Sequence, residues 1–269
     1  MMNSELKIEQ VTAANLKEIP FLQPEGWPDI LPSIKEYCTL DFCFPLKATL
    51  ENTLVGIGTA IFHGSTAWLG HIVVRKDYRN FGIGTTITQS LIELVQKKPC
   101  KSILLIATAL GEPVYKKLGF GIQTHYAFFE NGSIPVEESR QIRPFEQKYE
   151  GHLLALDHSI SGENRVQLFK QHLSNARLYI DNNNLLGFYL PTLGEGLIIA
   201  GTADAGLALM KSRYPDHKKI CLPIDNHEGI NFLMKNGFTE LRRASRMVLG
   251  ENFPWRASNM FSRIGGNLG

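Results

Sequence analysis

The sequence predicts an α/β fold with a mixed (α+β) sheet, and it predicts that this fold occurs twice along the chain. The first observation is an apolar strand at residues 67–74 that leads into a glycine-spaced turn, a helix, a second strand and a short helix ending in Gly119-Phe120. The second is the same order of elements in the other half of the chain, where Gly237-Phe238 ends it 118 residues further on. Strands that alternate with helices favour a helix-covered sheet, and a repeated order favours two copies of one fold.

The elements of the first half follow from hydrophobic spacing. Two β-prone runs, residues 46–50 and 54–62, flank three polar residues suited to a hairpin turn. From Gly84 onward, apolar residues recur at helical spacing until the chain approaches Pro99. The apolar run 102–108 is typical of a buried strand, and residues 112–118 are typical of a short helix that Gly119 ends.

The second half gives a shorter list of elements. A strand is predicted at residues 197–200, a helix at 203–212, a strand at 219–224, and a further segment at 226–236 before Gly237. Between the halves, residues 130–139 have the mixture of glycine, proline and serine that is typical of a linker. The predicted division is a first domain at 1–130, a linker at 131–140 and a second copy of the same fold at 141–269.

Composition and charge limit the classes of protein that fit. The 269 residues have room for one large domain or two ordinary ones, and 43% hydrophobic with 20% charged residues is a globular composition. The net charge of +2, without a long basic run, argues against a nucleic-acid partner. No secretory or membrane-spanning stretch stands out, so we expect a soluble cytoplasmic protein. The cysteines lack metal-ligand spacing, so we expect reduced thiols and no metal site; they are Cys38, Cys43, Cys100 and Cys221.

The most informative stretch is the turn at residues 79–85, Arg-Asn-Phe-Gly-Ile-Gly-Thr. Its two glycines allow the backbone to curl so that several N–H groups converge, and the following helix adds the positive end of its dipole. The turn is therefore predicted to bind phosphate of an anionic cofactor. The chain lacks the Gly-Lys-Ser/Thr ending of a nucleotide P-loop, and it has Ile87 where a dinucleotide-binding turn needs a small residue. A plain glycine turn without a ligand is the alternative.

Two motifs together resemble a known family. Arg79-Asn80-Phe81-Gly82-Ile83-Gly84, with Tyr115-Lys116-Lys117-Leu118-Gly119-Phe120 downstream, resembles the GCN5-related N-acetyltransferase (GNAT) superfamily, whose pyrophosphate motif is Gln/Arg-x-x-Gly-x-Gly/Ala. Gly26-Trp27, Ala67-Trp68-Leu69-Gly70 and the stretches 246–250 and 264–269 are similar to its tandem YitH-like subgroup. The resemblance implies a tandem acyl-CoA N-acyltransferase fold, with a complete first domain, a degenerate second one, and acetyl-CoA (coenzyme A) as cofactor.

The resemblance also implies where coenzyme A would bind. The backbone N–H groups of the turn would receive the pyrophosphate, and the strand before the turn would hydrogen-bond to the pantetheine arm. Arg79 holds the basic position of the family motif and would meet the 3′-phosphate. The residues assigned to the cofactor are Ile72, Val73, Val74, Arg79, Asn80, Phe81, Gly82, Ile83, Gly84, Thr85, Thr108 and Tyr115.

The resemblance assigns Tyr115 as the general acid toward the departing thiolate, with a core aromatic as the alternative. The general base is harder to assign, because a primary amine must lose a proton before it attacks and the strand before the turn carries no carboxylate. His71 is the candidate on that strand, directly or through a water, with a structural histidine as the alternative. Trp27 and Asp41 are assigned to the acceptor substrate, and Asp41 and Glu25 are lesser candidates for the base.

The second half departs from the family motifs. Its turn reads Gly-Thr-Ala-Asp-Ala-Gly at residues 201–206, with Asp204 where phosphate should sit, and Leu233 stands in place of the tyrosine. We expect this domain to bind no coenzyme A and to shape the acceptor pocket. Asp157, Asn164 and Arg165 resemble subgroup positions that could meet a polar substrate, with an ordinary salt bridge as the alternative.

The expected activity is therefore N-acetyl transfer from acetyl-CoA to a primary amine of a small-molecule or peptide acceptor, through a ternary complex. The alternative is a non-catalytic acetyl-CoA-binding sensor or interaction module, because the strand carboxylate is absent. The sequence assigns no particular acceptor and no oligomeric state.

Overall fold

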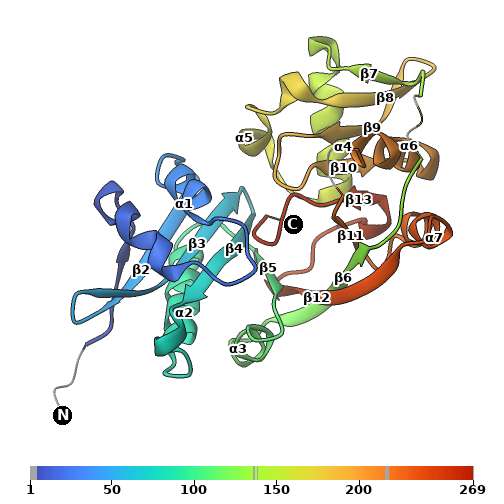
Figure 1. Cartoon of the computed structure of the whole chain (residues 1–269). Coiled ribbons are helices and arrows are strands. Elements are labelled where there is room, and N and C mark those ends of the chain that lie inside the picture. The colour runs from blue at the N-terminus through green and yellow to red at the C-terminus, as the bar shows by residue number, and fades with distance from the viewer. Residues whose placement is uncertain (1–4, 136, 138, 216–217, 269) are drawn as a thin grey trace. The chain divides into compact units, whose positions relative to one another are not determined.

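The chain divides into two compact units in a computed structural model that describes residues 5–135, 137, 139–215 and 218–268 (Figure 1). Unit 1 holds the described residues up to Gly121, together with Met247–Glu251 and Gly266–Leu268. Unit 2 holds Ile122–Arg246 and Asn252–Gly265. The predicted linker at 131–140 falls within the span of unit 2. Its residues 136 and 138 lie outside the described residues. The predicted domain boundaries remain a proposal.

Unit 1 contains a mixed sheet. Neighbouring strands run antiparallel from β1 to β4, whereas β4 and β5 are parallel. The strand order is β1 (Lys7–Gln10), β2 (Cys43–Leu50), β3 (Thr53–His63), β4 (Thr66–Val74) and β5 (Ser102–Ala107), followed by the last residues of β12 (Thr239–Gly250). Only a parallel pair needs a crossover helix, and the helix between β4 and β5 provides it.

The crossover helix packs its apolar side against the sheet of unit 1 (Figure 1). The helices of this unit are α1 (Leu31–Tyr37), α2 (Ile83–Gln96) and α3 (Glu112–Lys117), with 3₁₀ turns at η1 (Ala13–Leu22) and η2 (Lys76–Tyr78). The approach of α2 to β3 is close, because a Cβ atom at Gly58 would lie 2.7 Å from Ile87 Cγ2. Glycine in β3 therefore sets how near the helix, and the turn that begins it, can come to the strands.

Unit 2 contains a five-stranded antiparallel sheet and a second group of three neighbouring strands. The sheet order is β13 (Met260–Ser262), β10 (Leu197–Ala200), β9 (Asn184–Leu190), β8 (Arg177–Asp181) and β7 (Ile142–Pro144), and the second group is the first part of β12, then β6 (Gly121–Glu130) and β11 (Ile220–Pro223). The helices are α4 (Glu150–Ser161), α5 (Val166–Phe169), α6 (Ala203–Arg213) and α7 (His227–Lys235), with 3₁₀ turns at η3 (Gln147–Tyr149), η4 (Leu173–Asn175) and η5 (Ala257–Asn259). The core of this unit gathers between α6, β10 and β11.

The two copies predicted from the sequence are present. β4, α2, β5 and α3 end at Gly119-Phe120, and β10, α6, β11 and α7 end at Gly237-Phe238. Both closing glycines have a positive φ, +92° and +78°, which is the left-handed conformation expected of a residue that ends a helix. Among the described residues, no helix has the length and apolar character needed to cross a membrane.

Candidate active site

The strand before the turn contains a β-bulge at His71. Gly70 of β4 pairs with Thr59 of β3, but Val73 pairs with Ile57, so β4 carries one residue more than its partner over this stretch. His71 has a φ of +49° within the bulge. A left-handed residue other than glycine in a strand is costly, and such strain collects where a strand must redirect its backbone groups toward a ligand.

The pairing between β4 and β5 ends before this bulge. Their parallel pairing covers only Thr66–Trp68 against Ser102–Leu104. Beyond it, β4 continues to Val74 and β5 to Ala107 with no pairing recorded between them in the described part of the chain. The edge of β4 that faces away from β3 is therefore open where Ile72, Val73 and Val74 lie, and it can accept an extended, amide-bearing arm as an additional strand.

The turn after β4 presents free backbone donors. Asn80 has a φ of +68° and Gly82, which caps α2, has a φ of +81°. Because of this curl, the N–H groups of six consecutive residues donate to no carbonyl in the described structure. These residues are Asn80, Phe81, Gly82, Ile83, Gly84 and Thr85. Six unsatisfied amides at the start of a fourteen-residue helix are an arrangement that can hold a phosphate.

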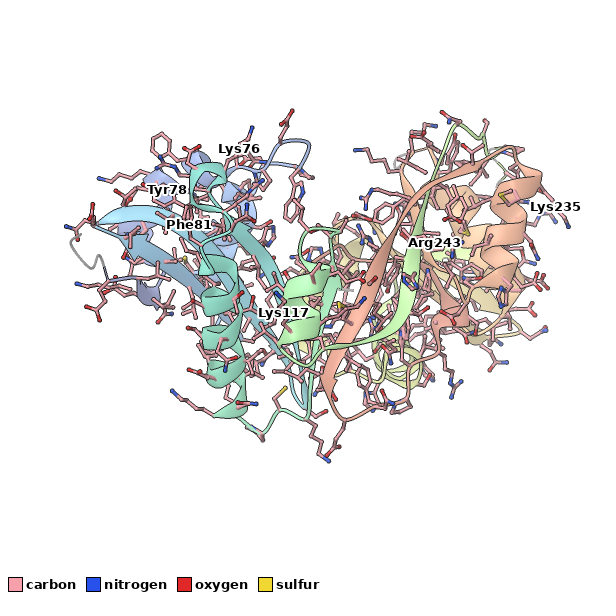
Figure 2. The ribbon with its side chains drawn as sticks, turned by 90° about the horizontal axis from the view of Figure 1, so that it is seen from below. Lys76, Tyr78, Phe81, Lys117, Lys235 and Arg243 are labelled. Carbon is pink, nitrogen blue, oxygen red and sulfur yellow. The ribbon has the colours of Figure 1, made fainter. Side chains whose placement is uncertain are left out.

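Side chains around the turn add positive charge and one exposed aromatic ring. Arg79 donates from Nε to the carbonyl oxygen of Val74 at 3.1 Å, so part of its guanidinium fastens the turn to β4. The Nη groups of the Arg79 guanidinium make no hydrogen bond to described residues. Lys76, Tyr78 and Phe81 project around the turn in Figure 2, and Phe81 is 77% exposed.

Tyr115 lies half-buried on α3. Its ring contacts that of Phe120 edge to face, with 6.0 Å between centroids. Burial raises the pKa of Tyr115 to about 12, so the phenol keeps its proton at neutral pH and can donate a hydrogen bond. Thr108 follows β5 and is exposed, and its hydroxyl accepts a hydrogen bond from the Gly111 N–H at 3.2 Å, which shapes the turn before α3.

His71 is uncharged at neutral pH. Burial lowers the pKa of its imidazole to about 4. The ring lies 5.6 Å from that of Tyr37 and 6.5 Å from that of Trp27, centroid to centroid. Nδ1 of His71 is buried and has no hydrogen-bond partner among the described residues. A neutral imidazole with a free nitrogen can bind or deprotonate a ligand, although its low pKa makes it a weak base.

The structure brings some of the predicted acceptor residues to His71 and not others. Trp27 lies on the loop before α1, which the Gln23 side chain holds by donating to the carbonyl oxygens of Trp27 at 3.1 Å and Pro28 at 3.0 Å. Asp41 and Glu25 are exposed, and no contact between either carboxylate and His71 is recorded in the described structure. Trp27 therefore lies at the bulge, whereas neither acid is found in contact with His71 in the described part of the chain.

Sequence reasoning did not find Tyr37, Gly70 and Asn267 as site residues. The Asn267 side chain donates from Nδ2 to the hydroxyl of Tyr37, and Asn267 also packs on Gly70. Tyr37 is the last residue of α1, and Asn267 lies 230 residues away along the chain. No local spacing pattern links residues this far apart, so only the fold reveals the contact.

The corresponding place in unit 2 is filled by the chain itself. β10 of unit 2 corresponds to β4 of unit 1. One edge of β10 pairs with β9, as β4 pairs with β3, and the other edge pairs with β13, with Ile198 opposite Ser262 and Ile199 opposite Met260. Asn226, before α7, donates to the Met260 carbonyl at 2.8 Å, so β13 is fastened on its β11 side too. Thr202 caps α6, accepting from the Ala205 N–H at 3.4 Å.

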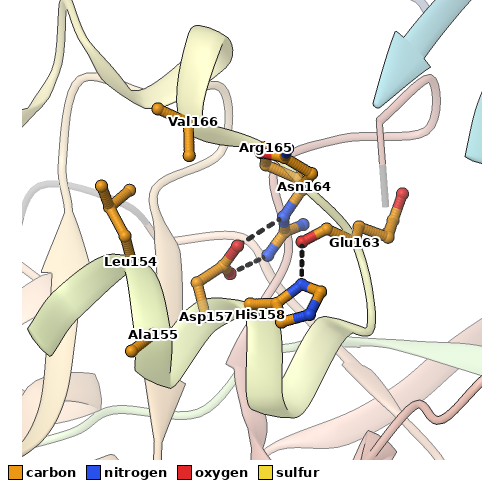
Figure 3. A pocket seen from close by; sticks show the side chains of 8 residues that line it. All are labelled: Leu154, Ala155, Asp157, His158, Glu163, Asn164, Arg165 and Val166. Carbon is orange, nitrogen blue, oxygen red and sulfur yellow. Dashed lines mark hydrogen bonds and ion pairs between the residues drawn. The ribbon is translucent and has the colours of Figure 1, made fainter. Parts of the chain in front are cut away.

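Unit 2 also has a surface hollow of about 330 Å³ beside α5 (Figure 3). Asp157 and Arg165 line it, but their side chains are at most 3% exposed and form a two-point ion pair, with Arg165 Nε 3.2 Å from Asp157 Oδ2. Burial raises the pKa of Asp157, and the guanidinium opposes that rise. The His158 ring Nδ1 lies 3.0 Å from the Glu163 carbonyl oxygen. The charges of Asp157 and Arg165 are therefore paired with each other, as buried charges must be.

Comparisons with known proteins concern both parts of the chain. Residues 10–120 match the Acetyltransferase (GNAT) family. The uncharacterized protein YyaT of Bacillus subtilis is 35% identical over 108 residues, which make up 40% of this chain and 72% of that protein. A Pyrococcus horikoshii structure described as that of a candidate acetyltransferase has a TM-score of 0.84 at 22% identity, over 98% of this chain and 96% of that one. A tandem GNAT protein from the clavulanic acid biosynthesis pathway has a TM-score of 0.61 at 11% identity, over 91% of this chain and 98% of its own. At these identities the two solved structures support the fold alone.

Proposed function

Because this chain belongs to the acetyltransferase (GNAT) family, we propose that unit 1 is an N-acetyltransferase that uses acetyl-CoA and a primary amine in a ternary complex. The observation that carries the proposal is the combination of the open β4 edge with the six free amides of the turn. An open strand edge suits an arm that contains amides, and the amides suit a pyrophosphate. Acetyl-CoA has both parts in one molecule.

The residues assigned to the cofactor fit these chemical needs. The N–H groups from Asn80 to Thr85 would hold the pyrophosphate, and the hydroxyl of Thr85 adds a donor. Ile72, Val73 and Val74 would pair with the pantetheine amides, and Thr108 would border the same opening from the end of β5. Arg79 has guanidinium N–H groups left for a phosphate after it bonds to Val74.

When bound, acetyl-CoA would supply the acetyl group, which passes to the amine nitrogen as the carbon–sulfur bond breaks. The nitrogen loses one proton in this step, and the departing thiolate takes up one, directly or through a water. Tyr115 would donate a hydrogen bond to the sulfur as negative charge develops on it. The thiol of a free cofactor has a pKa of about 8.5, so complete transfer of a proton from a phenol with a pKa of about 12 is uphill. Tyr115 would therefore stabilise the thiolate mainly as a donor.

The acceptor amine must present a lone pair. His71 can accept a hydrogen bond at its free nitrogen, but its low pKa means that it takes a full proton from an ammonium group poorly. We infer that the amine reacts from its neutral form, with His71 orienting it directly or through a water.

A second candidate is a protein that binds acetyl-CoA as a sensor without catalysis. One observation favours it: no carboxylate of the described residues is found in contact with His71, so a strong general base is missing there. The two candidates differ in one measurable property. Thiol release from acetyl-CoA, followed across an amino sugar, a polyamine and a lysine-containing peptide, should exceed the rate without amine for at least one acceptor. Binding of acetyl-CoA with no amine-dependent thiol release would favour the sensor.

We also propose that the second copy binds no coenzyme A. β13 fills the edge of β10 that would have to receive the pantetheine arm, and Asp204 adds a negative charge to the first turn of α6. A filled edge and an acid at the helix start both oppose a phosphate-bearing ligand.

A further inference from the structure

Residues Gly266–Leu268 belong to unit 1 and lie against β4. A Cβ atom added to Gly70 would be 2.4 Å from Asn267 Cβ and 2.9 Å from Asn267 Cα. Atoms cannot approach so closely, so only glycine at position 70 allows Asn267 to lie here. Gly70 is the residue immediately before His71, which places Asn267 beside the β-bulge.

A second contact fixes the carboxamide of Asn267. Its Nδ2 donates to the hydroxyl of Tyr37, which is 5% exposed. The ring of Tyr37 in turn contacts the His71 imidazole. Asn267 thus contacts the strand residue before His71 and Tyr37, one of the two aromatic residues beside the imidazole. We call Trp27, Tyr37, His71 and Asn267 the acceptor cluster.

Two polar atoms of the acceptor cluster have no hydrogen-bond partner among the described residues. Nδ1 of His71 has no hydrogen-bond partner, and Oδ1 of Asn267 accepts no hydrogen bond from any described residue. Both Tyr37 and His71 are uncharged at neutral pH, and no carboxylate is recorded in contact with the imidazole in the described structure. A primary amine in its neutral form needs acceptors for its N–H bonds while its lone pair points at the carbonyl, and carboxamide oxygens and imidazole nitrogens are such acceptors.

We propose that Asn267 is an acceptor-binding residue, whose carboxamide oxygen receives an N–H of the neutral primary amine beside His71. Tyr37 is its positioning residue, because the hydroxyl holds the other end of the carboxamide. This inference rests on the transferase activity proposed above. It assigns to the site of unit 1 a residue, Asn267, that comes after residues 252–265 of unit 2 in the chain.

The proposal predicts a particular kinetic change. A hydrogen bond to the amine that is present both before and during the transfer affects binding more than turnover. Asn267→Ala should therefore raise KM for the amine by about threefold to tenfold, the ratio that follows from losing one neutral hydrogen bond. The kcat and the KM for acetyl-CoA should stay close to those of the parent.

Two further variants separate binding from folding. Tyr37→Phe keeps the ring and removes only the hydroxyl that holds Asn267, so it should raise KM for the same amine by a smaller factor. Gly70→Ala adds the methyl group that displaces Asn267, and because it removes the same interaction its effect should not add to that of Asn267→Ala. Asn184→Ala is the matched control, because Asn184 is exposed and its side chain bonds, among the described residues, only to the Asn182 carbonyl, at 3.4 Å.

Steady-state kinetics on the full chain would test the proposal, with the amines of the thiol-release panel as probes. If the parent acetylates an amine and Asn267→Ala has the parent KM for it, the inference is overturned and the proposed function stands. A fall in kcat alone, or a matching loss of acetyl-CoA affinity, would also contradict it, because either would mark a purely structural role. If the parent acetylates no amine of the panel, the proposed function and the inference fail together.

Discussion

His71 combines an unusual backbone with an unusual protonation state. Its left-handed φ within β4 turns the strand where the pairing with β3 slips by one residue, and burial among aromatic rings keeps the imidazole neutral. The two properties have one origin, since the bulge is what directs the ring toward Tyr37 and Trp27. The residue is thus suited to orienting an uncharged amine.

The low pKa of His71 predicts a loss of stability in acid. The unfolded chain binds a proton at this site below a pKa of about 6.5, whereas the folded chain does so only near 4, so stability is full above the first value and falls between the two. From about pH 7 to about pH 5, this group should cost the parent about 2 kcal/mol. His71→Asn tolerates the left-handed backbone and does not titrate, so urea unfolding at both pH values should show a smaller loss for the variant. Equal losses in variant and parent would contradict the assignment.

Tyr115 should matter for turnover and not for cofactor affinity. Tyr115→Phe keeps the ring that packs on Phe120 and removes the donor to the sulfur, so kcat should fall by about tenfold to a hundredfold. The dissociation constant for acetyl-CoA, measured by calorimetry, should stay near that of the parent. An unchanged kcat would remove Tyr115 from the mechanism.

At this scale the sequence predicted what a local motif can carry. The spacing of Tyr115 from Gly119, and the position of His71 on the strand before the turn, were both readable from the chain. Tyr37 and Asn267 were not, because their contact joins residues 230 positions apart. The pairing depends on a glycine at 70 that permits close packing, and a single glycine in a strand carries no information about its partner.

The turn before α2 is the element on which cofactor binding depends, and its two glycines differ. Gly82 has a φ of +81°, which a β-branched residue avoids. A Cβ at Gly84 would lie 3.6 Å from Val74 Cγ2, an ordinary contact. Only Gly82 is therefore required by the backbone itself.

This difference predicts unequal effects of substitution. Gly82→Val should raise KM for acetyl-CoA by about tenfold or more, because strain of about 1–3 kcal/mol would uncurl the donors. Gly84→Ala should stay within about threefold of the parent, since a methyl group fits there and alanine is a good helix former. Rates measured over a range of acetyl-CoA concentrations would show this order, and equal effects would count against it.

The elements around the turn were predictable because each has strong periodicity. β3, β4, α2, β5 and α3 lie within a residue or two of the predicted ranges. β13 was not predicted, because three residues between irregular segments show no period. Its importance comes from where it pairs, on the edge of β10, and pairing is a property of the fold.

At the scale of the whole molecule, the two copies share an order of elements but differ at one strand edge. In unit 1 the strands separate and leave an edge open, whereas in unit 2 the corresponding edge is occupied by β13. The two Gly-Phe endings indicated the duplication, and Asp204 indicated that the second copy has lost the phosphate-binding motif. It did not indicate that residues Gly266–Leu268 belong to unit 1, because chain order alone places them after unit 2.

The buried ion pair of unit 2 should affect stability and leave the cofactor site intact. Asp157→Ala leaves the Arg165 charge buried without its partner, so unfolding should become easier by about 3–5 kcal/mol. Below the unfolding temperature, acetyl-CoA should bind with the parent dissociation constant. Thermal unfolding and calorimetry would test the two statements separately, and a variant with parent stability would contradict the first.

We propose that the chain has one acetyl-CoA site, at the turn of unit 1. Isothermal titration of the full chain with acetyl-CoA tests it most directly. One equivalent of acetyl-CoA should bind per chain in the parent, and Gly82→Val should bind it about tenfold or more weakly. Two equivalents per chain, no binding by the parent, or parent affinity in Gly82→Val would contradict it.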